Sequence, residues 1–316
     1  MSDDGTIAHF DEKAPQAYKR FAIIRYFDGE KWSRDQYLPE NTTSVGPSLA
    51  VITPELANPA LCCFESATSS ASNGRMMATK DGLAWYAVKH NLPKNIRESA
   101  IVAYTPKGGQ PSLYVFASLP GGNSWSSSKD AETWNTPQQI PTDILAAKGQ
   151  HFSAAVFRGE IIVACAGEHE PECASFDGST WKKLAPTDAV PYGQPNISVV
   201  DDTLYNVTPD DDGKKFQYQT YDGKQWSEQT EIPTIRADKI SAGLMGTFDG
   251  STLVCVTIRI DETLAVLNSS TSTDGGTTWS EPLIIGQTLS ADQSRVFSLA
   301  TFRKRLYCAI DWAEGQ

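Results

Sequence analysis

"STSTDGGTTWSEP", residues 270–282, places an aspartate, two glycines and a tryptophan between two runs that have the composition of β-strands. Glycine accepts positive φ, and aspartate accepts hydrogen bonds from backbone amides two residues further on, so Asp274-Gly-Gly276 predicts a tight turn. The run before it, residues 264–267, and the residues from Trp279 onward predict the two strands of a hairpin.

Related segments recur along the chain. Five more tryptophans follow an aspartate and a turn in the same way: Asp28/Trp32, Asp81/Trp85, Asp130/Trp134, Asp177/Trp181 and Asp222/Trp226. Successive tryptophans of the six are 53, 49, 47, 45 and 53 residues apart. A period of this length, with four strand-like runs in each unit, is typical of β-propeller blades.

The two ends of the chain complement each other. Residues 21–26 form the second half of a unit that has no first half, whereas residues 295–301 and 305–310 form a first half with no second. Joining them would close a ring and remove exposed sheet edges. The sequence therefore predicts an all-β fold, a six-bladed β-propeller closed by pairing of the C-terminal strands with the N-terminal half-blade. It predicts one domain over residues 1–316.

Composition limits the partners and the location. The net charge of −11 and the pI of about 4.9 argue against nucleic acid and anionic membrane surfaces as partners. No apolar stretch approaches the roughly 20 residues that cross a bilayer. The acidic start, "MSDDGTIAHF", lacks an apolar signal region, so we expect a cytoplasmic protein or one released without a classical signal peptide.

Cysteines and histidines do not form a metal-binding pattern, and we expect neither a metal nor another cofactor. Cys63, Cys255 and Cys308 occupy the same place in their units, which predicts small buried side chains. Cys165 and Cys173 flank a predicted hairpin turn, where two alternatives are open: buried thiols or a disulfide.

Candidate site residues lie in the loops that enter the first strand of each unit, because these loops converge on one mouth of a propeller's central channel. The candidates are Arg97, Glu98, His151, Tyr192, Gln194, Arg236, Asp238, Asp292 and Arg295. The arginines suit an anionic group, because guanidinium forks match carboxylates. The other interpretation is a solvated rim on which the arginines pair with neighbouring acids. No catalytic residue can be assigned, since no known catalytic motif is present.

The segment from Ser272 to Trp279 resembles the Asp box, S-x-D-x-G-x-T-W, which recurs in sialidases and other six- or seven-bladed propellers. This resemblance implies a structural turn between third and fourth strands, away from the ligand face. Chain length and the sixfold repeat also resemble the fungal fucose-binding lectins. Those lectins carry an arginine, a glutamate and an aromatic residue in each pocket between blades, and the second strands here lack a regularly repeated arginine.

These resemblances imply a lectin-like protein that binds a carbohydrate or another small polar ligand. Trp125 and Trp312, which lie outside the repeated anchors, are candidates for stacking on a sugar face. The alternative is an enzyme that uses the central funnel as a pocket, since some fungal propellers similar to these lectins catalyse cycloadditions in natural-product pathways. Sialidase-like hydrolysis is less well supported, because "FAIIRYF" at residues 21–27 does not match the F/Y-R-I-P motif of sialidases. The sequence does not indicate an oligomeric state.

Overall fold

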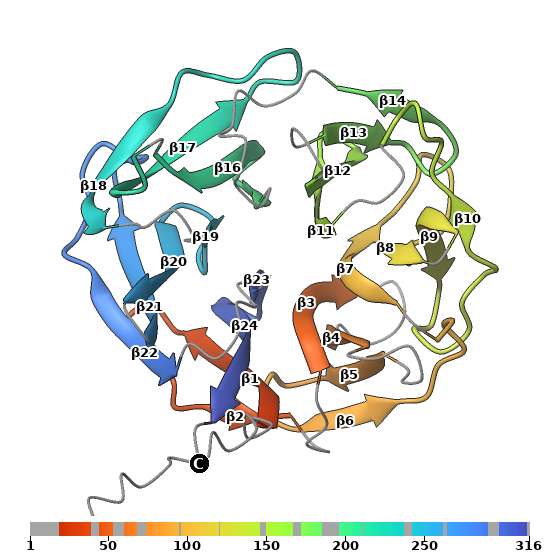
Figure 1. Cartoon of the computed structure of the whole chain (residues 1–316), viewed down its shortest axis with the longest axis horizontal. Helices are drawn as coiled ribbons and strands as arrows, with labels where there is room; N and C mark the ends of the chain where they lie inside the picture. Colours follow the sequence, from red (N-terminus) through yellow and green to blue (C-terminus); the bar gives the residue numbers. More distant parts are fainter. Residues whose placement is uncertain are drawn as a thin grey trace, which may run out of the picture.

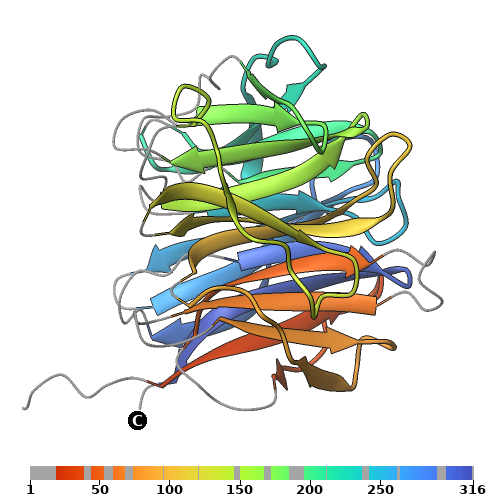
Figure 2. The same cartoon turned by 90° about the vertical axis from the view of Figure 1, so that its right-hand side faces the viewer.

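The computed structural model of the chain is built from β-sheets that stand around a central axis, as the view down that axis shows (Figure 1). The structure describes residues 19–38, 44–52, 60–67, 74–94, 96–119, 121–145, 150–166, 172–184, 196–210, 212–236, 242–261, 264–289 and 297–314. Figure 2 shows the sheets from the side, with their strands running along the axis. No helix occurs in these ranges, so none of them supplies a helical segment that could span a membrane. The prediction of an all-β, propeller-like fold is confirmed.

Three four-stranded sheets follow one another along the chain, and within each sheet neighbouring strands are consecutive and antiparallel. Their strands are β3 (Ser44–Ile52), β4 (Ala60–Ala67), β5 (Arg75–Thr79) and β6 (Trp85–Val88); β7 (Arg97–Tyr104), β8 (Ser112–Leu119), β9 (Gly122–Ser128) and β10 (Gln138–Gln139); β11 (Gln150–Phe157), β12 (Glu160–Ala166), β13 (Glu172–Phe176) and β14 (Trp181–Lys183). The lowest-numbered strand of each sheet lies innermost and the highest-numbered strand lies on the rim (Figure 1).

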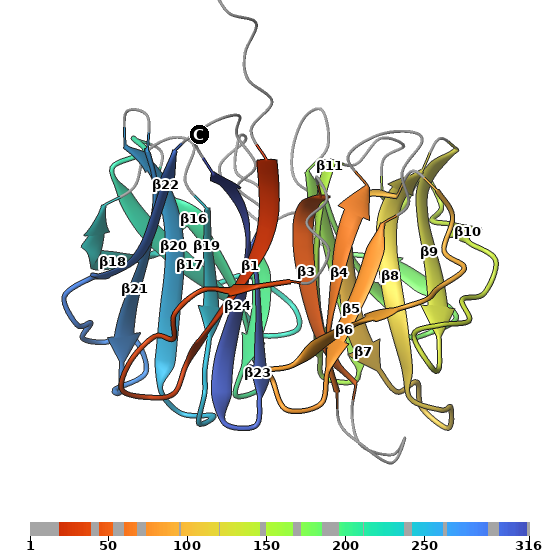
Figure 3. The same ribbon diagram turned by 90° about the horizontal axis from the view of Figure 1, so that it is seen from below.

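A fourth sheet combines both ends of the described chain. Its order is β2 (Gln36–Tyr37), β1 (Lys19–Phe27), β24 (Arg305–Glu314) and β23 (Phe297–Phe302). β1 and β24 are antiparallel and form nine residue pairs, from Lys19 with Glu314 to Phe27 with Leu306. Strands that are far apart in the sequence thus share one sheet, which Figure 3 shows from its outer side.

The remaining sheet has eight strands. They are β15 (Ile197–Val200), β16 (Thr203–Pro209), β17 (Lys215–Tyr221), β18 (Thr230–Arg236), β19 (Ala242–Gly246), β20 (Leu253–Asp261), β21 (Leu264–Ser272) and β22 (Leu283–Leu289). One residue pair, Val207 with Gly243, joins the β15–β18 half to the β19–β22 half. Gly243 permits this approach, because a Cβ there would lie 2.5 Å from the Val207 side chain. Within the described ranges the structure therefore contains four four-stranded sheets and this larger one, and the count of six blades stays a prediction.

The repeated aspartates stabilise the turns between the third and fourth strands of the units, named here the Asp–Trp turns. In each of them the aspartate accepts a hydrogen bond from the backbone N–H of the residue immediately before the tryptophan; the donors are Lys31, Ala84, Thr133, Thr180, Gln225 and Thr278. Hydrogen bonds from the Thr278 hydroxyl and amide lower the pKa of Asp274 to about 2, since they favour the charged carboxylate. A seventh turn with the same bonding, at Asp249, joins β19 to β20 without a tryptophan and was missed by the sequence analysis.

The repeated tryptophans pack between neighbouring units. Each contributes to a different hydrophobic cluster of the described residues, and the six are Trp32, Trp85, Trp134, Trp181, Trp226 and Trp279. Trp279, for example, packs against a cluster that contains Tyr218 and Val207 from the preceding unit. The structural interpretation of these residues is confirmed.

Glycines of the Asp–Trp turns also face the preceding unit. A Cβ at Gly29, Gly178, Gly223 or Gly276 would lie 2.6 to 2.9 Å from a side chain of that unit, and one at Gly82 would overlap the hydroxyl of Tyr307. At Gly276 the atom approached is the Tyr218 hydroxyl oxygen, and φ is 92°. In these five turns glycine serves close packing as well as backbone conformation, whereas Ala131 takes the equivalent place in the sixth turn with φ at 66°.

All six cysteines are buried and unpaired. Cys165 lies opposite Glu172 and Cys173 lies opposite Ala164, so the two thiols occupy successive register positions. Successive positions point to opposite faces of a sheet, and the two cysteines accordingly belong to different hydrophobic clusters. The disulfide alternative is wrong, and the expectation that Cys63, Cys255 and Cys308 are buried is confirmed.

Candidate functional site

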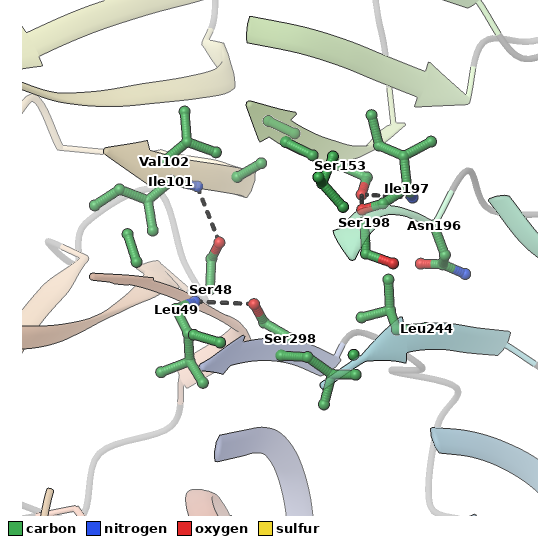
Figure 4. Close-up of a pocket in the computed structure, with 18 of the residues that line it drawn as sticks. Ser48, Leu49, Ile101, Val102, Ser153, Asn196, Ile197, Ser198, Leu244 and Ser298 are labelled. Carbon is green, nitrogen blue, oxygen red and sulfur yellow. Dashed lines mark hydrogen bonds between the residues drawn. The ribbon is translucent and has the colours of Figure 1, made fainter. Parts of the chain in front are cut away.

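A cavity of about 370 Å³ lies at the centre of the ring. It is lined by residues of the six strands that come first in their repeat units, β3, β7, β11, β15, β19 and β23, and by Leu306 of β24. Figure 1 shows these strands around the axis, and Figure 4 shows their side chains around the open centre.

Serine hydroxyls connect adjacent inner strands. An innermost strand turns one edge toward the cavity, where its peptide groups have no strand partner. The Leu49 N–H donates to the Ser298 hydroxyl oxygen at 3.0 Å, and the Ile101 N–H donates to Ser48 at 2.9 Å (Figure 4). These bonds link β23 to β3 and β3 to β7, so the serines satisfy edge amides that sheet pairing leaves open.

The same arrangement continues around the ring. The Ile197 N–H donates to the Ser153 hydroxyl at 3.0 Å, and that hydroxyl lies 3.2 Å from the Ile197 carbonyl oxygen, to which it can donate. The Met245 N–H donates to Ser198 at 3.2 Å. A hydroxyl oxygen has two lone pairs, so each of these serines can still accept a hydrogen bond from a ligand. The cavity wall is thus both apolar and rich in neutral hydrogen-bonding groups.

His151 occupies a β-bulge at the start of β11. Gln150 pairs with Ala166 and Phe152 with Cys165, which leaves His151 as the extra residue, half-buried and with φ at 59°. β3 has an equivalent bulge at Gly46, where φ is 62°. Bulges re-aim side chains, and left-handed backbone is unusual for a residue other than glycine. His151 lines the cavity, whereas the equivalent Gly46 offers no side chain.

The other sequence candidates are placed as follows. Arg97 and Glu98 are the first residues of β7, at the same end of the inner strands as His151, and Arg236 ends β18 on the rim of its sheet. The structure describes only the backbone of these three residues. Tyr192, Gln194, Asp238, Asp292 and Arg295 lie outside the described residues. The structure therefore brings one of the candidates, His151, to the cavity wall with its side chain described.

Two sequence expectations about aromatic side chains can also be compared with the structure. Trp125 packs against Phe176 with ring centroids 4.7 Å apart, in the cluster between the second and third sheets. Its ring is part of the packing between sheets, so it is not a free stacking surface. Trp312 belongs to β24, and its side chain is not among those the structure describes.

The sequence analysis missed the serines of the cavity wall. A weak signal was present, because Ser48-Leu-Ala and Ser298-Leu-Ala begin the inner part of two first strands, and Ser153-Ala-Ala takes the same place in a third. Comparing the first strands with one another, rather than the loops before them, would have found it.

The described wall is electrically neutral. None of the lining residues is Asp, Glu, Lys or Arg, and His151 is the titratable side chain among them. Within the described ranges no group of three or more His, Cys, Asp or Glu could hold a metal ion. The arrangement can therefore bind and orient a neutral molecule through hydroxyls, backbone groups and one imidazole.

No family model and no curated protein matches this sequence. Solved structures do resemble the fold. The α-L-arabinofuranosidase Arb93A from Fusarium graminearum, solved with an iminosugar inhibitor, has a TM-score of 0.58 and 11% identity over 93% of this chain and 98% of its own. AofleA from Arthrobotrys oligospora has a TM-score of 0.56 and 14% identity over 96% and 86%. The α-L-arabinanase of Penicillium chrysogenum, solved with arabinobiose, has a TM-score of 0.52 and 10% identity over 84% and 93%. At such identities the likeness is one of fold.

Proposed function

We propose that the protein binds a carbohydrate or another small polar ligand in its central cavity. The observation that carries this proposal is the cavity itself, whose wall presents serine hydroxyls from β3, β11, β15 and β23 and edge peptide groups between apolar side chains. Its volume of about 370 Å³ falls in the range of small-molecule sites. A sugar offers both hydroxyls and apolar C–H faces, which matches such a wall.

Two of the structural neighbours support the ligand class. One is an α-L-arabinofuranosidase with an iminosugar inhibitor, and another is an α-L-arabinanase that was solved with arabinobiose. The sequence candidates at the mouth extend the proposal. Arg97 and Glu98 begin an inner strand beside the cavity, and the candidates outside the described residues precede other inner strands in the sequence.

The proposed scaffold is a ring of six blades closed by β1 and β24. Six inner strands line the cavity, and each repeated tryptophan belongs to its own hydrophobic cluster. In this scheme the eight-stranded sheet is two blades that touch through the Val207–Gly243 pair. A single pair is a small contact beside the nine pairs within β20–β21, which supports the division.

Calorimetric titration with a panel of neutral sugars that includes arabinobiose tests the binding proposal. We expect one ligand per chain and at least a tenfold weaker affinity for the His151→Gly variant, which replaces the lining imidazole by the residue found at the equivalent bulge. The control is Gln139→Ala on the exposed rim strand β10. An absence of binding to every sugar would refute a carbohydrate as the ligand, and several equal sites per chain would refute the cavity as the site.

A second function, an enzyme using the cavity to orient its substrate, is favoured by His151. A non-glycine residue held at positive φ in the wall of a cavity suggests functional selection, because such strain costs about 1–3 kcal/mol. An imidazole there could move a proton while the hydroxyls orient the reacting groups. Mass spectrometry of each bound compound after long incubation would test this, since unchanged mass and connectivity for all of them would exclude turnover of the panel.

A further inference from the structure

A histidine holds the chain where it passes from the first four-stranded sheet to the second. This passage leads from β6, on the rim of the first sheet, to β7, the innermost strand of the second, through residues 89–96 (Figure 1). We name these residues the β6–β7 connection; Asn95 alone among them lies outside the described residues. The connection leads directly into Arg97 and Glu98, which begin β7 beside the cavity. The bonds that hold the connection therefore help to fix the position of the first residues of β7.

His90 bonds through both nitrogens of its ring. Nε2 lies 3.0 Å from the carbonyl oxygen of Gly74, which directly precedes β5. The Leu92 N–H donates to Nδ1 at 3.3 Å. A carbonyl oxygen can only accept a hydrogen bond and a backbone N–H can only donate one, so Nε2 carries the ring proton and Nδ1 carries none. The two partners thus specify a neutral imidazole in one tautomer.

The surroundings of the His90 ring are largely apolar. The ring is half-buried and meets Phe64 of β4 edge-on, with 6.1 Å between the ring centroids. Leu92 is 6% exposed and belongs to the hydrophobic cluster between the first and second sheets. A proton on Nδ1 would turn the acceptor of the Leu92 N–H into a second donor. Two donors cannot form a hydrogen bond, so an imidazolium must either leave this position or deprive Leu92 of its partner.

Among the described residues no carboxylate forms an ion pair with His90. Glu65, next to Phe64, is paired with Arg75, next to Gly74. Successive strand residues point to opposite faces, so this ion pair lies on the other face of its sheet from Phe64 and the His90 ring. Burial lowers the pKa of His90, and its hydrogen bond to the Gly74 carbonyl opposes this effect. The other charged or titratable residues on the neighbouring face of β4, on β6, on the connection and its continuation, and on the turn bonded to Asn91 are Cys62, Tyr86, Lys89, Lys94, Arg97, Glu98, Asp130 and Glu132.

Two neighbouring attachments of the same stretch contain no titratable side chain. The Asn91 side chain accepts a hydrogen bond from the Trp134 N–H at 2.7 Å and donates one to the Trp134 carbonyl oxygen at 3.2 Å. The hydroxyl of Ser99, a residue that lines the cavity, lies 2.8 Å from the hydroxyl of Ser66 on β4. Of these three attachments only the one through His90 can change its charge in weakly acidic solution.

We propose that His90 is a pH-sensitive positioning residue, which holds the β6–β7 connection against the first sheet when neutral and releases it when protonated. Release also loosens the start of β7 and thereby lowers the affinity of the cavity for its ligand, a step that rests on the function proposed above. The fold favours the neutral ring, so the stabilising effect of His90 is fully present above its usual pKa of 6.5. It is lost as the pH falls through the lower pKa of the folded chain.

Hydrogen exchange measured by mass spectrometry tests the proposal on the full chain, from about pH 7.5 to about pH 4.5, with rates corrected for the pH dependence of an unprotected amide. In the natural chain we expect the corrected rate of the segment 89–96 to rise about fivefold or more in acid, which corresponds to the loss of one hydrogen bond. His90→Asn should show no such rise, because an asparagine oxygen accepts from the N–H two residues further on and does not titrate. His151→Gln, the matched control, removes the other described histidine and should keep the rise.

The segment 222–227 is an internal control in every variant. Its turn is held by Asp222, whose pKa is lowered from 3.8 by hydrogen bonds from the Gln225 and Lys224 amides, so its corrected rate should not change over this range. A rise in His90→Asn equal to that in the natural chain overturns the proposal. So does a natural chain in which the segment 89–96 rises no more than the segment 222–227, and this comparison decides the matter even if His90→Asn does not fold.

Calorimetric titration at both pH values with the sugar panel tests the link to the cavity. We expect the affinity of the natural chain to fall about fivefold in acid and that of His90→Asn to fall less. Equal affinity at both pH values would refute control of the cavity by His90. Absence of binding at either pH would refute a carbohydrate as the ligand, whereas the exchange measurement alone decides whether His90 releases the connection.

Discussion

The two adjacent glycines of the segment 270–282 allow the contribution of one contact between units to the free energy of unfolding to be measured. Gly275 and Gly276 both have positive φ, at 73° and 92°. A Cβ at Gly275 would meet no atom within 4 Å, whereas one at Gly276 would lie 2.6 Å from the Tyr218 hydroxyl oxygen. Alanine at either position therefore suffers the same kind of backbone strain, and alanine at Gly276 also collides with the preceding unit.

The expected losses in the free energy of unfolding follow from the backbone strain and from the collision with Tyr218. Left-handed backbone costs an alanine about 1–2 kcal/mol, and this is offset by about 0.4–1 kcal/mol because glycine loses more chain entropy on folding. Gly275→Ala should thus lower the free energy of unfolding by roughly 1 kcal/mol. Overpacking adds about 1–3 kcal/mol at Gly276, since Tyr218 is 9% exposed and packs against Tyr205 at 5.7 Å between ring centroids. We expect Gly276→Ala to lose roughly 2–4 kcal/mol.

Urea denaturation of both variants measures this difference, with the slope of the transition checked for constancy. The double variant Gly276→Ala/Tyr218→Phe removes the colliding oxygen and leaves the nearest ring carbon at 3.4 Å, an ordinary contact. It should therefore recover about 1 kcal/mol or more relative to Gly276→Ala with Tyr218 intact. Equal losses for the two single variants would refute the reasoning, because the contact between units would then contribute nothing.

Three further predictions address pH, strain and closure. The pKa of Asp274 is about 2 in the folded chain, against a usual 3.8. The stabilising effect of its carboxylate is therefore present above pH 3.8 and is lost as the pH falls through 2. Between pH 5 and pH 2 the urea midpoint of Asp274→Asn should accordingly fall less than that of the natural chain. His151→Gly should change the free energy of unfolding by less than about 1 kcal/mol, because relief of the backbone strain and the added chain entropy of glycine offset each other. His151→Ala keeps the backbone strain, so its melting temperature should be lower than that of His151→Gly. Removing residues 305–314 deletes the nine-residue partner of β1, so calorimetry should no longer find one cooperative transition; a truncated chain that melts like the intact one would contradict ring closure.

Much of the fold could be predicted because its key contacts are local. Asp274 bonds to an amide four residues away, so the residue types that make the turn recur together in the sequence. The order of the strands within a unit could be predicted from the sequence for the same reason. The merging of two units into one eight-stranded sheet was not, because it depends on the missing side chain of Gly243 against a residue 36 positions earlier.

The cavity wall was less predictable because its contacts are long-range. The bond from Leu49 to Ser298 joins residues 249 positions apart, and nothing near either residue indicates the other. His151 was identified from its loop, but the reason for its position is a bulge whose partner residues lie on β12. The sequence could therefore suggest His151 as a candidate, whereas only the folded chain shows which serine hydroxyl bonds to which backbone amide.

The pairing of β1 with β24 has a consequence for the growing polypeptide. Phe27 and Leu306 are neighbours in the fold, yet the ribosome adds about 280 residues between them, which takes roughly 15 to 60 seconds at ~5–20 residues per second. During that interval β1 is an apolar strand without its partner, in a cell crowded with other nascent chains. Lys19 and Arg20 begin its sequence KRFAIIRYF, and Arg25 interrupts the apolar run. Charged residues hinder the pairing of an exposed strand with other chains. We therefore expect the basic residues of β1 to reduce such pairing until β24 has been synthesised.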